Sequence, residues 1–207
     1  GVAHFLEHMM FKGTENRTWQ DINEDAAYNA IIHNAYTNNF ETAYTASVHN
    51  SHVNEALDLL SDQMFCSTFP KKELDMEKNV IHEECEMYLK DPSSAYYDAV
   101  RGELLNSQLE TSIIGTHETI AGITRSDVAK FRKKYGTNNT TLVITSSLEL
   151  AEVKKLCKKH LKKSDLEEVK TTPIKSTLVV DYADKDLRTE NCSDTQSRIG
   201  MFFNSPP

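Results

Sequence analysis

Two histidines and a glutamate near the start of the chain have the types and the spacing needed for metal-assisted hydrolysis. The run His4-Phe-Leu-Glu7-His8 places two imidazoles four residues apart. On a helix, residues i and i+4 lie on the same face, so both rings can reach one metal ion. Catalytic zinc sites use three protein ligands and leave one position for a water molecule, whose pKa the metal lowers. We therefore expect one Zn²⁺ on His4 and His8, with Glu7 as the general base that takes a proton from the attacking water.

A third ligand is expected from a strongly charged segment over residues 71–90. It contains four candidate glutamates, which are Glu77, Glu83, Glu84 and Glu86. Glu77 and Glu84 are seven residues apart, two helical turns along one face, and Val80 and Ile81 between them indicate that this face packs on the core. A carboxylate on a packed face is costly unless it is paired or binds a metal. We therefore expect Glu84 as the third zinc ligand and Glu77 as a catalytic residue that supports the charge of the site.

The elements that must position these residues can be read from apolar spacing and from helix-start signals. Val2, Phe5, Leu6 and Met9 form an apolar stripe on a first helix, which Gly13 ends. Further helices are expected from Thr18, with Asp21 in a capping box, and over 52–65, 71–90, 96–109, 124–135 and 150–162. Residues 34–48 predict two short strands joined through Asn38–Asn39, and later strands are expected over 140–147, in STLVVDY and in RIGMFF.

Composition narrows the class of protein. The chain has 207 residues, a hydrophobic fraction of 39% and a net charge of −8, which is ordinary for a globular domain. The acidic balance argues against a nucleic-acid partner and permits a basic peptide as substrate. No apolar run approaches the roughly 20 residues that a membrane span needs. The four cysteines, at 66, 85, 157 and 192, include no CxxC pair and predict no disulfide framework.

Domain boundaries follow from a change of composition near residue 164. Residues 1–163 are expected to form the zinc-binding catalytic domain. The charged, apolar-poor stretch 164–173 is the predicted linker, and 174–207 is the expected start of a second, truncated unit. Both a mitochondrial matrix and a bacterial cytoplasmic location fit the sequence.

Several ordered motifs resemble the pitrilysin (insulinase) family of inverted zinc metallopeptidases. They are GVAHFLEHMMFKGT with its H-x-x-E-H core, NAYTNNFETAY, ELDMEKNVIHEE and IIGTHETIAGITRSDVAKFRKKY. In that family the third ligand lies about 76 residues beyond the second histidine. Here Glu84 lies 76 residues after His8. The resemblance is greatest to the branch that contains the catalytic β subunit of mitochondrial processing peptidase and its bacterial relatives.

The resemblance implies an α+β fold with a mixed, mainly antiparallel sheet backed by helices, as one half of a two-half clam shell. It implies that a peptide adds as a strand beside Asn34, Ala35 and Tyr36, which would bind substrate through its backbone. This chain departs from the family in having Ile31, Ile32 and His33 where glycine is common. The resemblance also implies that the catalytic domain over 1–163 lacks its first strands, which are expected upstream of the zinc helix. The second homologous half, in cis or as a partner subunit or homodimer, is expected to complete the active enzyme.

The function expected is therefore zinc-dependent endopeptidase action on extended peptides or presequences. The alternative is a non-catalytic structural or binding subunit of the same fold within a larger complex. Such subunits commonly lack one or more of the motif residues, whereas all four are present here. A zinc hydrolase of small molecules fits less well, because the edge-strand segment suits a polymeric backbone. The remaining histidines are expected to be surface or capping residues: His33, His49, His52, His82, His117 and His160.

Overall fold

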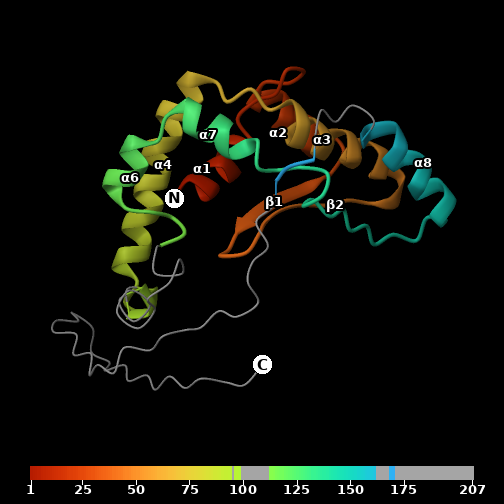
Figure 1. Ribbon diagram of the computed structural model, residues 1–207. Helices are drawn as coiled ribbons and strands as arrows, with labels where there is room; N and C mark the ends of the chain where they lie inside the picture. The colour runs from red at the N-terminus through yellow and green to blue at the C-terminus, as the bar shows by residue number, and fades with distance from the viewer. Residues whose placement is uncertain (95, 99–111, 162–167, 171–207) are drawn as a thin grey trace.

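The structure is a computed structural model that describes residues 1–94, 96–98, 112–161 and 168–170, with helices on two sides of a β-hairpin (Figure 1). Its elements are α1 (Val2–Met9), α2 (Trp19–Tyr28), β1 (Ile32–Thr37), β2 (Thr42–Ser47), the 3-10 turn Asn50–His52, α3 (Val53–Cys66), α4 (Lys71–Lys90), α6 (His117–Gly122), α7 (Arg125–Arg132) and α8 (Leu150–Leu161). The class is α+β, as predicted, and the sheet within the described residues is one antiparallel pair.

Reciprocal caps explain where several helices begin. The Thr18 hydroxyl accepts the Asp21 backbone N–H, while the Asp21 carboxylate accepts the Thr18 backbone N–H. Such a pair satisfies two backbone donors that a helix N-terminus otherwise leaves without partners. Thr124 and Asp127 repeat the arrangement at the start of α7, which confirms both boxes expected from the sequence.

Helix α1 is the centre of the main core. Its Phe5, Leu6 and Met9, and Met10 just after its end, are completely buried. They pack in one apolar cluster with residues of α4 and α7, including Ile81. In Figure 1, α1 lies between α4 and the hairpin. Burying this stripe at about 25 cal/mol per Å² of apolar surface is what fixes the orientation of the helix that carries the H-x-x-E-H motif.

The hairpin places residues 34–36 on its surface. Strands β1 and β2 pair from Ile32 with Ser47 to Thr37 with Thr42. Successive β1 side chains alternate between exposed and half-buried, so Asn34 and Tyr36 face solvent while Thr37 faces the protein. Within the described residues β1 pairs with β2 alone, which leaves its other edge free of strand pairing.

Three expectations are wrong, and three more lie wholly or largely outside the described residues. Residues 140–147 form no strand, because the described part of the chain offers them no pairing partner and β-branched residues need one. Val80 is 47% exposed, so the packed face of α4 is carried by Ile81 and not by its neighbour. His160 is buried and not a surface residue. Most of the expected helix over 96–109 and of the linker over 164–173, and the strands beyond it, lie outside the described residues.

Candidate active site

Helices α1 and α4 bring the three predicted zinc ligands to one place. His4 Nε2 lies 3.7 Å and His8 Nε2 lies 3.4 Å from Glu84 Oε2. One ligand atom from each of the three residues lies within 4.8 Å of the others, and this is the one such cluster of three or more donors in the part of the chain that is described. The two imidazoles meet edge to face with ring centroids 4.6 Å apart.

These separations fit a tetrahedral zinc site. Zinc binds histidine nitrogen at about 2.0–2.1 Å and carboxylate oxygen at about 2.0–2.2 Å, so ligand atoms stand roughly 3.3–3.5 Å apart around the ion. The His8–Glu84 distance falls in this range, and the His4–Glu84 distance is only slightly longer. Two imidazoles and one carboxylate leave the fourth position open, as in catalytic rather than structural zinc sites.

Glu77 acts on the site through His8. Its carboxylate is almost fully buried and accepts the His8 Nδ1–H at 2.8 Å. Its other oxygen, Oε2, forms an ion pair with Lys12 Nζ at 2.6 Å. Burial alone would raise the pKa of Glu77, but the hydrogen bonds from His8 and Lys12 outweigh it and lower that pKa. The ionised carboxylate thus fixes the tautomer of His8 that leaves the Nε2 lone pair facing Glu84.

His4 is neutral at physiological pH. Burial, and then the neighbouring His8, lower the pKa of His4 to about 4. A neutral imidazole is the form that binds a metal. Its Nδ1 is buried and has no hydrogen-bond partner among the described residues. In that part of the chain His4 thus has no counterpart to Glu77, the acceptor that orients the ring of His8.

Glu7 lies on α1 beside the ligand cluster, at the end of the hairpin. Its side chain is buried, and its Oε2 accepts a hydrogen bond from the Thr37 hydroxyl at the last residue of β1. Burial raises the pKa of Glu7, although the Thr37 hydrogen bond opposes this effect. A carboxylate with a raised pKa is a stronger proton acceptor, which suits a general base.

The structure also shows contacts that sequence reasoning missed. Lys12 lies four residues after His8 but beyond the end of α1 at Met9, so the helical i, i+4 rule does not by itself place it beside Glu77. Thr37 gives no local signal, because its contact with Glu7 joins residues 30 apart in the chain. The predicted substrate residues Asn34, Ala35 and Tyr36 lie together on β1, and the Tyr36 hydroxyl donates to Glu41.

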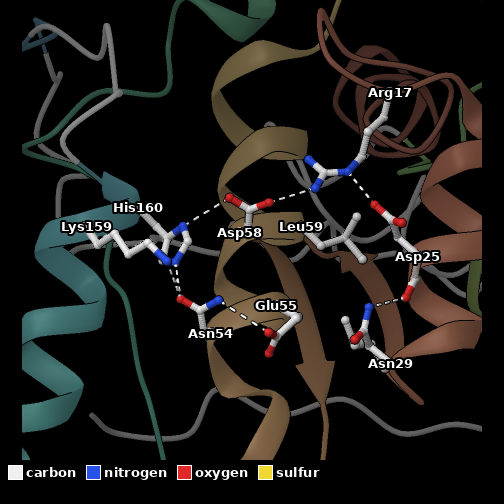
Figure 2. A pocket seen from close by; sticks show the side chains of 10 residues that line it. Arg17, Asp25, Asn29, Asn54, Glu55, Asp58, Leu59, Lys159 and His160 are labelled. Atoms are coloured by element: carbon white, nitrogen blue, oxygen red, sulfur yellow. Dashed lines mark hydrogen bonds and ion pairs between the residues drawn. The ribbon is translucent and has the colours of Figure 1, made fainter.

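A separate cavity of about 400 Å³ lies between α2, α3 and α8 (Figure 2). Arg17 reaches into it and contacts Asp25 and Asp58 at 2.7 Å each, while the buried His160 of α8 faces Asp58 at 3.1 Å. Arg17, which precedes α2, thus joins Asp25 of α2 to Asp58 of α3, and Asp58 also contacts His160 of α8. The pocket shares no lining residue with the ligand cluster. We interpret the polar contacts along its wall, such as that between His160 and Asp58, as the interactions that hold α8 on α3.

The H-x-x-E-H motif on α1 and the three donors that α1 and α4 bring together agree with the metallopeptidase family that the sequence resembles. Residues 1–117 match the family described as Insulinase (Peptidase family M16), and the chain belongs to this family. Over 69% of its length, the chain is 37% identical to a Bacillus subtilis protein named "Uncharacterized zinc protease YmxG", and the match covers 35% of that protein. Over 91% of its length, the chain is 28% identical to the probable β subunit of mitochondrial-processing peptidase from Arabidopsis thaliana, and this match covers 36% of that protein. The chain thus spans about a third of the length of these relatives.

Solved structures show the same fold. The chain matches the Escherichia coli periplasmic protease PqqL with a TM-score of 0.74 and 29% identity, over 84% of this chain and 20% of that one. It also matches a structure described as the inactive domain of a peptidase M16 from Pseudomonas fluorescens, with a TM-score of 0.74 and 16% identity. That match covers 83% of this chain and 43% of the other. The second match concerns the fold alone. No helix among the described residues has the length and apolar content to cross a bilayer.

Proposed function

We propose that this chain carries the zinc-binding and catalytic half of an endopeptidase that hydrolyses extended peptides. The observation that supports the proposal most directly is the convergence of His4, His8 and Glu84 within 4.8 Å, on two separate helices. The relatives named as zinc proteases support the same metal and the same class of reaction.

Each residue at the site has a role in this proposal. His4, His8 and Glu84 would hold one zinc ion, which when bound polarises a peptide carbonyl and acidifies a water molecule. Glu7 takes the proton of the attacking water and delivers it to the leaving amine, as a general base and then a general acid. Glu77 keeps His8 in its binding tautomer and, with Lys12, sets the charge behind the site.

The edge of β1 that is free of strand pairing within the described residues suits an extended peptide as substrate. A peptide that adds as a strand is bound mainly through its backbone, so Asn34, Ala35 and Tyr36 would bind many sequences. The net charge of −8 favours basic peptides, and a presequence of the kind that processing peptidases act on would fit. A second homologous half, in cis or as a partner subunit or second copy, would close over the bound peptide.

A non-catalytic subunit of the same fold is the competing function. The match to a structure titled as an inactive domain shows that the fold occurs without activity. The presence of Glu7 together with all three donors favours catalysis here, because a purely structural subunit has no need of a buried carboxylate beside a ligand cluster.

The test compares wild type with Glu7→Gln in the full-length protein and any partner subunit, using a cationic fluorogenic peptide. We expect about one zinc per site in both proteins and hydrolysis in wild type alone, since glutamine keeps the shape of the side chain but cannot accept the proton. Undiminished hydrolysis by the variant would rule out the role given to Glu7. Wild-type protein that binds zinc but cleaves no peptide would favour the non-catalytic alternative.

A further inference from the structure

The oxygen of Glu7 that faces the hairpin is held by a single residue. Within the described residues, the Thr37 hydroxyl is the one hydrogen-bond donor to the Glu7 carboxylate, and it contacts Oε2. Thr37 Oγ1 also lies 3.2 Å from Thr42 Oγ1. These two threonines are cross-strand partners at the closed end of the hairpin. The hairpin therefore reaches the proposed base through a pair of hydroxyl groups.

We propose that Thr37 is a positioning residue for the general base and that Thr42 orients Thr37. This inference rests on the proposed function of Glu7. A hydroxyl has one proton, so a Thr37 hydroxyl that donates to Glu7 can only accept from Thr42. The result is a one-directional chain of hydrogen bonds from Thr42 through Thr37 to Glu7, in which each bond polarises the next. With Oε2 held in this way, the other carboxylate oxygen is left for the reacting proton.

The chain of hydroxyls couples peptide binding to the base. Thr37 ends the same strand that carries Asn34, Ala35 and Tyr36. A peptide paired along β1 would order that strand and with it the Thr37 hydroxyl. The contact with Glu7 is thus expected to matter for turnover more than for peptide affinity, because the peptide backbone need not touch the hydroxyl itself.

Two substitutions separate positioning from stability. Thr37→Val keeps the branched shape that suits a strand and removes the hydroxyl, whereas Thr37→Ser keeps the hydroxyl and removes the branch. We expect Thr37→Val to lower kcat by about 10- to 100-fold, the effect of losing one hydrogen bond to a charged group. Thr37→Ser should retain kcat within about threefold, with KM and zinc content unchanged in both.

The assay uses the full-length protein with any partner subunit. A Thr37→Val enzyme with wild-type kcat would overturn the inference, as would a loss of kcat that follows the loss of zinc or of thermal stability in both variants. Inactive wild-type protein would instead refute the proposed function.

Crystal structures of the two variants supply a readout that needs no activity. Glu7 should keep its rotamer in Thr37→Ser and leave it in Thr37→Val. An unmoved Glu7 carboxylate in the valine variant would overturn the inference by itself.

Discussion

Replacement of Glu77 by glutamine tests how the buried charge behind His8 contributes to metal binding. Glu77 is 3% exposed and accepts from His8 Nδ1 and from Lys12 Nζ through different oxygens. Its lowered pKa means that it is a carboxylate at neutral pH, held in that form by both donors. A glutamine has the same shape but only one accepting oxygen, so it must turn an NH₂ group toward either His8 or Lys12.

The expected loss follows from the role of such carboxylates. Removing the acceptor of a metal-binding histidine typically lowers metal affinity by 10- to 100-fold, which corresponds to about 1.4–2.8 kcal/mol. The loss has two sources here. His8 becomes a weaker base at Nε2, and its ring is no longer fixed in the orientation that faces Glu84. Lys12 is 29% exposed and can turn toward solvent, so the zinc-free fold should survive the change.

The measurement is a zinc titration in competition with a chromophoric chelator at neutral pH. The matched control is Glu83→Gln, which removes the same charge from an exposed position of α4 and should change zinc affinity by less than about twofold. Zinc affinity of Glu77→Gln within twofold of wild type would refute the reasoning, because it would mean that His8 binds metal equally well without its acceptor.

Two further predictions concern stability. Burial raises the pKa of Asp62, but hydrogen bonds from Asn16, Arg17 and Thr14 outweigh it and lower that pKa below the unfolded value of about 4. The carboxylate thus stabilises the fold above pH 4 and loses this effect as the pH falls through its folded pKa. Asp62→Asn should cost about 1.5–3 kcal/mol at pH 7 in urea unfolding, with a gap to wild type that closes in acid, and a pH-independent gap would contradict this. Ile81→Ala should cost about 2–5 kcal/mol and the neighbouring Val80→Ala under about 1, measured by the same unfolding, whereas equal costs would contradict the burial difference.

The sequence predicts well those parts of the fold that are determined by residues close together in the chain. The bounds of α4, Lys71–Lys90, are those expected from its charge pattern and from the break at Pro70. Helices α2 and α7 begin at capping boxes that four consecutive residues determine. The ligand pair on α1 follows from the i, i+4 rule, and the separation of Glu77 from Glu84 follows from two turns of helix. In each case the interaction that decides the structure is local.

What sequence did not predict depends on partners far along the chain. Strand propensity over 140–147 says nothing about whether a neighbouring strand is present to pair with it. From the sequence, His160 looks like part of a solvated lysine-rich face. In the structure it is buried, and its ring nitrogens form hydrogen bonds with Asp58 and Asn54 of α3. Local pattern cannot distinguish these outcomes, because they are decided by which helix docks against which.

The geometry of the ligand cluster is a consequence of core packing more than of contacts among the ligands. The apolar residues Phe5 and Met9 hold one face of α1 in the core. His4 and His8 each come one residue earlier, about 100° around the helix, and so lie on the adjacent face beside Glu84 of α4. On α4, Ile81 and Cys85 are buried in the same cluster on either side of Glu84. The distance between imidazoles and carboxylate is therefore set by how closely α1 packs on α4. A large residue introduced at Cys85 would separate the helices, and zinc affinity should fall although no ligand has been changed.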